Sequence, residues 1–323
     1  MSGNNNILCI SDLCWDEHWS VEQQFMSRLS KNNRVLFVEP PVTIFSIFNK
    51  LKYSLLRRQL VHWLKGGIRK ENENLIIATP PPVLPFRYLG GINYLNSFII
   101  VRWINRISKL LNFKSPVIWV FEPGAAGIVR KIEHSLIIYH CLDSWIDHDD
   151  WWNSNKSIEK QERKLLVISD LVFAVSKSLI DKKSRYNKKI FYIPNGADFY
   201  HFSKAQDVHL KVPQEVLILS KPVIGFVGVI GSRIDVELMS YVARKKKYWS
   251  FLFVGPIASN IKGLSSLMRL QNVYFVGMKA ISELPSYLKV MDVCTIPYIY
   301  NDFTANCFPL KLFEYLSAGK PVV

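Results

Sequence analysis

Two residues of opposite charge, Lys311 and Glu314, lie three positions apart near the end of the chain. The surrounding run predicts a helix over 309–318, with Pro309 as its first residue and Gly319 as its terminator. A cation in the first turn interacts unfavourably with the helix dipole, so the presence of Lys311 there needs another explanation. Charge-assisted contact with a diphosphate is one such explanation. The Glu314 carboxylate suits the two hydroxyls of a ribose, because it can accept both hydrogen bonds. The alternative interpretation is an amphipathic surface helix with a solvated Lys and Glu.

A glycine-rich run, 225–231, is the second candidate for binding phosphate. It contains Gly228 and Gly231 and follows a predicted strand over 223–227. Backbone N–H groups in such a turn can approach a phosphate, and the helix that follows offers its positive end. The alternative is packing, since turns from strand to helix often need glycine. The run is not GxGxxG, and the chain contains no P-loop sequence.

The run 306–323 resembles the nucleotide-binding motif of GT-B-fold glycosyltransferases that carry a Glu-x7-Glu signature. Glu314 stands at the second Glu of that signature, Asn306 stands where the first Glu is expected, and the Ala-Gly-Lys-Pro-Val-Val run follows closely. The runs 194–198 and 284–297 also fit these enzymes. Two further runs, 15–24 and 139–145, resemble bacterial cell-surface polysaccharide transferases of the teichuronic-acid type.

This resemblance implies transfer of a sugar, of the hexosyltransferase type, from a nucleoside diphosphate sugar, without a metal or other cofactor. The implied acceptor is a hydroxyl group, on a lipid-linked or growing cell-surface polysaccharide. In the second domain, the resemblance assigns the ribose to Glu314, the diphosphate to Lys311, the phosphates to the turn at Gly228 and Gly231, and the donor sugar to Asn306.

Two departures from the family pattern leave the stereochemical course open. Val229 stands where Arg is common, and Ile234-Asp235 where Lys-Gly is common, so we expect Arg233 to substitute in neutralising the diphosphate. Asn306 keeps hydrogen bonding but loses the charge of Glu. These departures also support the alternative of a noncatalytic sugar-nucleotide-binding or membrane-associated scaffold protein.

In the first half of the chain, His140 and Asp143 follow a predicted strand over 136–139. We expect both at the end of the strand that faces the ligand, where either could act on the acceptor hydroxyl as a base or by hydrogen bonding. The alternative is that His140 is structural.

A block over 50–70 contains seven basic residues, no acidic one, and interleaved apolar residues. This mixture is typical of a helix that lies in a membrane interface. It therefore predicts a membrane- or acceptor-binding surface at Arg57, Arg58, Trp63 and Lys65, on a cytoplasmic protein peripheral to the inner face of the cell membrane. The alternative is an ordinary surface helix with a solvated basic face.

Short apolar runs alternate with predicted helices, and the pattern restarts near residue 205. It predicts an α/β chain of two Rossmann-like doubly wound domains facing across a cleft, namely an acceptor-binding domain over 1–205 and a nucleotide-sugar-binding domain over 206–323. Strands are expected at 7–10, 35–38, 75–78, 117–121, 136–139, 171–175, 190–193, 223–227, 251–254, 273–275 and 293–296. Since the run 321–323 should begin a further strand, we expect the second domain to be incomplete.

The composition limits the classes of partner and of protein that remain possible. A net charge of +15 admits phosphorylated small molecules, membrane surfaces and nucleic acid as partners, but no nucleic-acid-binding module accompanies it. Five scattered cysteines indicate reduced thiols rather than a disulfide framework or a zinc site. The sequence has neither the layout of a signal peptide nor an apolar run long enough to cross a membrane.

Overall fold

The computed structural model describes residues 5–16, 19–43, 53–85, 90–143, 155–301, 304 and 308–323. The chain divides into two compact units, Met1–Pro194 and Asn195–Val323. This division comes earlier than the boundary expected near residue 205, because the segment after Pro194 packs with the second unit. Asn195 donates a hydrogen bond to the Phe308 carbonyl oxygen at 2.9 Å, and Phe202 and Ala205 lie in the core of that unit.

The first unit is built on one eight-stranded sheet with the order β3-β4-β2-β1-β5-β6-β7-β8. All neighbouring strands are parallel except β3, which pairs antiparallel with β4 at the sheet edge. The central strands are buried on both faces, which explains why they read as unbroken apolar runs. The strands are β1 (Asn6–Ile10), β2 (Arg34–Val38), β3 (Ile68–Lys70), β4 (Leu75–Ala78), β5 (Val117–Val120), β6 (Leu136–Cys141), β7 (Leu171–Ala174) and β8 (Ile190–Tyr192).

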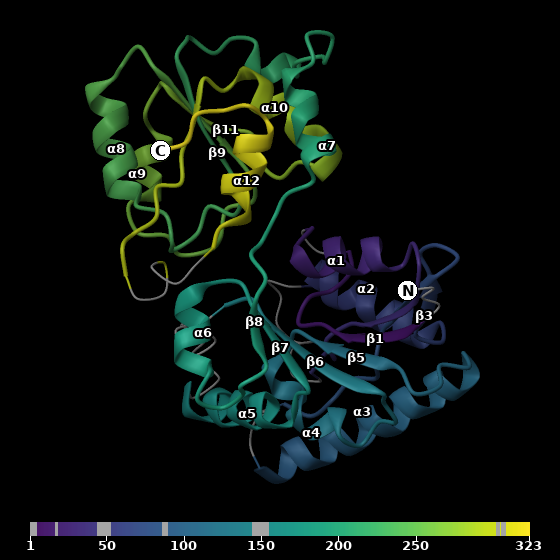
Figure 1. The fold of residues 1–323 in the computed structure, drawn as a ribbon. Coiled ribbons are helices and arrows are strands. Elements are labelled where there is room, and N and C mark those ends of the chain that lie inside the picture. The colour runs from purple at the N-terminus through teal and green to yellow at the C-terminus, as the bar shows by residue number, and fades with distance from the viewer. Residues whose placement is uncertain are drawn as a thin grey trace. The chain divides into compact units, whose positions relative to one another are not determined.

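Helices cover both faces of this sheet. Helices α1 and α2 lie on one side, and α3, α4 and α5 lie on the other (Figure 1). Their bounds are α1 (Val21–Leu29), α2 (Tyr53–Leu64), α3 (Gly90–Leu110), α4 (Ala126–Val129), α5 (Asn155–Ile168) and α6 (Lys177–Lys183), with a short 3-10 turn η3 (Pro123–Ala125) before α4. The antiparallel strand β3 was not expected from the sequence.

The second unit has a four-stranded parallel sheet with the order β11-β10-β9-β12. One face packs against α8 and α9, and the other against α7, α10 and α12 (Figure 1). The elements are α7 (Phe199–Phe202), β9 (Val223–Val227), α8 (Val236–Lys245), β10 (Ser250–Val254), α9 (Leu264–Met268), β11 (Val273–Phe275), α10 (Leu284–Val290), β12 (Val293–Cys294) and α12 (Leu310–Ser317). The expected α/β class with two parallel sheets is confirmed.

Parallel strands place all their carboxyl ends at one edge of a sheet, and ligands of such sheets bind outside that edge. The carboxyl edge of each unit is therefore where functional side chains are sought.

Candidate functional site

Glycines mark the carboxyl edge of the second sheet. Gly228, Gly255 and Gly277 follow β9, β10 and β11, and all have positive φ, of 139°, 146° and 73°. A Cβ added to Gly255 would lie 2.0 Å from the Gly228 carbonyl oxygen, so the two turns touch backbone to backbone. Only glycine permits this combination of conformation and approach. The sheet therefore presents bare backbone at the edge where a ligand would bind.

The structure refines the role expected for the glycine turn. The Gly228 and Ile230 N–H groups donate to the carbonyl oxygens of Val254 and Pro256, both at 2.9 Å. These two groups are committed within the protein and do not serve a phosphate. A Cβ at Gly231 would make only ordinary contacts, of 3.8 and 3.9 Å, so packing does not require glycine there.

Lys311 extends from the first turn of α12 to the glycine turn. A Cβ at Gly228 would lie 3.1 Å from Lys311 Cε and 3.3 Å from Nζ, so the ammonium lies directly against this glycine. Nζ donates a 2.6 Å hydrogen bond to the Tyr298 hydroxyl and lies 5.2 Å from the centroid of the Phe226 ring. Two aromatic rings and one hydroxyl thus hold the cation at the carboxyl end of β9.

Glu314 lies one turn further along α12. Its side chain is half-buried, and burial raises its pKa to about 7, while nearby Lys311 opposes the shift. Among the residues that the structure describes, none donates a hydrogen bond to this carboxylate. A half-ionised acceptor without a donor suits a ligand that brings hydroxyl groups.

Helix α12 is tied to β9 by Tyr315, a residue that the sequence did not single out. The buried Tyr315 hydroxyl accepts a hydrogen bond from Val227 N–H at 2.8 Å and contacts the Val227 carbonyl oxygen at 3.2 Å. At the other end, Gly319 has φ +69°, and the N–H groups of Gly319 and Lys320 donate to the carbonyls of Leu316 and Tyr315 at 3.0 Å. This is a Schellman cap, as expected of Gly319. Pro309 is the N-cap rather than the first helical residue.

Two further residues that the sequence predicts at the donor site are Arg233 and Asn306. Arg233 is exposed, and its carbonyl oxygen accepts a 2.9 Å hydrogen bond from Ile299 N–H, which joins the segments after β9 and β12. Asn306 lies outside the described residues.

His140 does not lie where the sequence placed it. Strand β6 runs two residues further than expected, because His140 and Cys141 pair with Phe173 and Ala174 of β7. The imidazole is 1% exposed, within 5.0–5.9 Å of the ring centroids of Phe25, Trp119, Phe121 and Phe173. Burial lowers its pKa to about 3, and neither ring nitrogen has a hydrogen-bond partner among the described residues. A core position of this kind does not fit a base that contacts an acceptor hydroxyl.

Asp143 follows β6 and lies two residues beyond its end, where its side chain is half-buried. Its carbonyl oxygen is 3.4 Å from the Cys141 thiol. Asp143, unlike His140, therefore lies at the carboxyl edge of the first sheet.

The basic block forms helix α2 and strand β3. Arg57, Arg58 and Lys65 are exposed, together with Val61 and Leu64, and Trp63 is half-buried. The exposed positions recur at helical spacing, so they form one face of α2 with apolar residues between cations. This face has the composition that the sequence predicted for a membrane interface.

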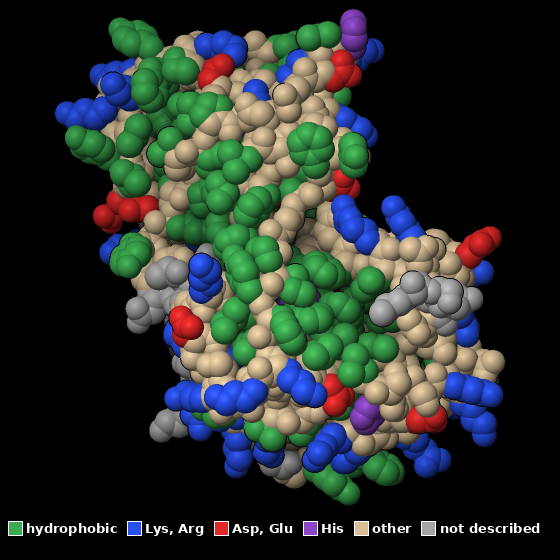
Figure 2. Space-filling view, viewed as in Figure 1, with side chains coloured by type: hydrophobic (Ala, Val, Ile, Leu, Met, Phe, Trp, Pro, Cys, Tyr) green, Lys and Arg blue, Asp and Glu red, His purple; other side chains and the backbone are tan. Residues whose placement is uncertain are grey.

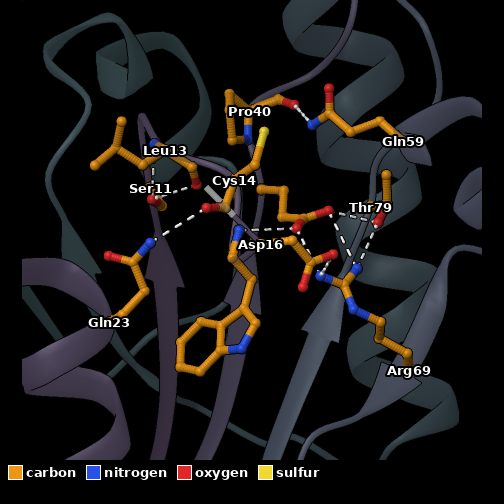
Figure 3. A network of polar contacts seen from close by, with 11 residues as sticks. Ser11, Leu13, Cys14, Asp16, Gln23, Pro40, Gln59, Arg69 and Thr79 are labelled. Carbon is orange, nitrogen blue, oxygen red and sulfur yellow. Dashed lines mark hydrogen bonds and ion pairs between the residues drawn. The ribbon is translucent and has the colours of Figure 1, made fainter. Parts of the chain in front are cut away.

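Arg69 differs from the other cations of the block, a distinction that the sequence did not provide. Its guanidinium lies 3.0 Å from both Asp16 Oδ2 and the buried Glu39 Oε1, and Glu39 also accepts from Thr79 Oγ1 at 2.6 Å (Figure 3). Gln59 of α2 donates to the Pro40 carbonyl oxygen at 3.2 Å. This network fixes α2 and β3 to the carboxyl ends of β2 and β4.

Neither a metal site nor a membrane span is found in the described part of the chain. No three His, Cys, Asp or Glu side chains there are grouped to hold a metal ion. No helix among the described residues is long and apolar enough to cross a membrane.

Comparison with known proteins agrees with this geometry. Residues 221–323 match the family model of glycosyl transferases group 1. The chain is 30% identical over 241 residues to the teichuronic acid biosynthesis glycosyltransferase TuaH of Bacillus subtilis (strain 168), covering 68% of this chain and 59% of that one. The chain thus spans less than two thirds of the length of this relative.

Solved structures share the fold at low identity. Sucrose-phosphate synthase from Thermosynechococcus elongatus superposes with a TM-score of 0.68 at 15% identity, covering 98% of this chain and 80% of that one. Anabaena HepE in complex with UDP-glucose superposes with a TM-score of 0.64 at 14% identity, covering 98% and 79%. The chain therefore has the GT-B fold, and its residues 221–323 are similar to the group 1 glycosyltransferases.

Proposed function

We propose that this protein transfers a sugar, of the hexose type, from a nucleoside diphosphate sugar to a hydroxyl acceptor. The observation that carries the proposal is the position of Lys311 against Gly228, with Glu314 one turn further along α12. In this arrangement Lys311 stabilises the leaving diphosphate, and Glu314 accepts hydrogen bonds from the ribose. Arg233 adds positive charge beside the diphosphate, and Asn306 contacts the donor sugar.

The acceptor is assigned to the first unit and to a lipid-linked or growing cell-surface polysaccharide. The name of the Bacillus relative supports this class, since that protein is described as a teichuronic acid biosynthesis enzyme. Asp143, at the carboxyl edge of the first sheet, is the residue proposed to contact the acceptor hydroxyl. UDP-sugars are the first donors to test, because HepE was crystallised with UDP-glucose.

The outward face of α2 is proposed to hold the enzyme on the inner face of the cell membrane. Its cations, Arg57, Arg58 and Lys65, suit anionic headgroups, and Val61, Trp63 and Leu64 suit the interface below them. The acceptor would then meet the enzyme at the surface where its lipid is held.

The test is thermal stabilisation by a panel of nucleoside diphosphate sugars. A ligand at 100 times its Kd adds about 2.7 kcal/mol to the free energy of unfolding. We expect Lys311→Met to lose most of this stabilisation, while Lys247→Met, which removes an exposed cation elsewhere in the unit, retains it. Equal stabilisation of both variants would refute the assigned donor site. Binding without transfer to any acceptor would favour the noncatalytic alternative.

A further inference from the structure

A pocket that the proposed roles do not use lies in the first unit, at the carboxyl ends of β1, β2 and β5. Its cavity volume is about 70 Å³, room for a slender group rather than a bulky ligand. Helix α3 forms one wall, through Ile100 and Ile104. The remaining apolar lining includes Ile10, Val38, Val83 and Ile128. The pocket is therefore a largely apolar space at the edge of the sheet where ligands bind.

The polar residues of the lining are already engaged within the protein. Asn96 exchanges two 3.0 Å hydrogen bonds with the backbone of Leu84, and Ser97 Oγ donates to Asn93 Oδ1 at 3.3 Å. Ser11 Oγ donates to the Leu13 carbonyl oxygen at 2.8 Å. A ligand rich in hydroxyl groups would have to compete with these bonds, whereas a hydrocarbon would not.

Two buried carboxylates set the charge of the lining. Glu39 is held by Arg69, Thr79 and the Trp15 N–H (Figure 3), and Glu122 accepts a 2.9 Å hydrogen bond from Gly124 N–H. Glu39 is paired with Arg69, and the carboxylates of Glu39 and Glu122 in the lining disfavour a phosphate inside the pocket. A charged head group is therefore kept outside.

The surface beside the pocket is apolar as well. Asn93, Asn96 and Ser97 of α3 line the pocket, and on the same turns of the helix Tyr94, Leu95 and Phe98 are exposed. Helix α3 contains no acidic residue over its 21 positions. The walls are stiff, because Pro40, Pro41 and Pro80 contribute to them and Gln59 of α2 bonds the Pro40 carbonyl oxygen.

We infer that this pocket binds the hydrocarbon chain of an amphiphilic acceptor, while the polar head of the acceptor remains outside the pocket. The inference rests on the proposed function and names the class of its acceptor. The carboxylates and the hydrogen-bonded polar groups of the lining disfavour binding of the polar head. The apolar residues of the lining favour binding of the hydrocarbon chain.

A homologous series of n-alkyl glucosides tests the inference in the absence of any donor. Each methylene that enters the pocket should tighten the Kd by roughly fourfold, until the pocket is full. Titration calorimetry below the critical micelle concentration measures the slope, defined as the change in log Kd for each added methylene. We expect Ile100→Phe and Ile128→Trp, which fill the pocket, to abolish it; the half-buried Ile128 provides a variant with a lower risk of misfolding. Circular dichroism verifies that each variant is folded.

Phe98→Ser, on the exposed face of α3, is the matched control and should keep the slope. A Kd that does not change with chain length overturns the inference, as does a slope that survives both filling variants. Loss of the slope in Phe98→Ser alone would place the chain on the outer surface of α3 instead. With donor present, the KM for alkyl glucosides should fall with chain length at constant kcat. If alkyl glucosides bind in the pocket but receive no sugar, the pocket binds hydrocarbon chains but is not an acceptor site. A failure of the proposed donor site is distinguished from this outcome, because it appears as a loss of nucleoside diphosphate sugar binding at Lys311.

Discussion

Glu314 is a carboxylate that burial holds near half-ionisation at neutral pH. Its pKa is raised to about 7, and the ionised form accepts hydrogen bonds best. We therefore expect the affinity for a nucleoside diphosphate to increase as the pH rises through about 7. Glu314→Gln should remove this dependence, as measured by calorimetric titration at pH 6, 7 and 8. Identical pH profiles in the two proteins would show that the carboxylate does not contact the ligand.

The same shift predicts the opposite trend for the stability of the free protein. The folded-state pKa of Glu314, about 7, lies above its ordinary value of 4.5, so the folded protein binds more protons between these pH values. The stability contributed by the protonated group is fully present below pH 4.5 and is lost as the pH rises to about 7. Glu314→Gln should therefore gain up to roughly 3 kcal/mol relative to the native protein above pH 7.

A substitution at His140 distinguishes a structural role in the core from a role in binding or activating the acceptor. Its pKa of about 3 lies below the ordinary 6.5, so the unfolded protein binds more protons between these values and stability falls as the pH drops below 6.5. His140→Leu removes this loss and also two ring nitrogens that have no hydrogen-bond partner among the described residues. We expect a higher melting temperature, with a larger gain at pH 5 than at pH 8, and sugar transfer within about twofold of the native rate. A folded variant without transfer would restore the acceptor role.

At the scale of elements, the Tyr315 hydroxyl joins α12 to the end of β9 at the candidate donor site. Tyr315→Phe removes the partner of the Val227 N–H at the end of β9 and leaves a buried donor unsatisfied. We expect a loss of about 1–3 kcal/mol in stability by chemical denaturation, together with weaker diphosphate binding. Tyr241→Phe, on the exposed surface of α8, is the matched control and should change both quantities little. Equal losses in the two variants would contradict an anchoring role for Tyr315.

Elements with a strong local pattern were predictable, and those that depend on partners distant in sequence were not. Strands β4, β9 and β11 match the expected ranges to the residue, because each is a short apolar run bounded by turn residues. The end of β6 was misplaced, because only pairing with β7 shows that His140 continues the strand. Strand β3 was missed because Ile68–Lys70 is held by pairing with β4 and by the ion pair of Arg69.

The same distinction applies to the residues of the candidate site, some of which could be predicted from the sequence and some of which could not. Lys311 and Glu314 were identified from their types and spacing on one helix. Tyr298, Phe226 and Tyr315 were not, since they reach α12 from other strands and loops or resemble ordinary core aromatics in sequence.

At the scale of the whole molecule, the chain has a net charge of +15. Lys and Arg side chains are distributed over the visible face instead of gathering in one stripe (Figure 2). A dispersed charge gives weak attraction to any polyanion, whereas specific membrane attachment needs cations beside exposed apolar side chains. The outward face of α2 meets that condition, so local arrangement rather than total charge should determine membrane binding.

Two triple variants of equal net charge separate these effects. Arg57→Gln/Arg58→Gln/Lys65→Gln removes the cations of α2, and Lys245→Gln/Lys247→Gln/Lys262→Gln removes exposed cations of the second unit. At about 1 kcal/mol for each cation at the surface, the first should weaken binding to phosphatidylserine-containing vesicles by roughly 100-fold. The second should change it by less than about threefold, because these cations are not part of the outward face of α2. Vesicle sedimentation at low and physiological salt measures both, and equal weakening would mean that net charge alone attracts the protein to the membrane.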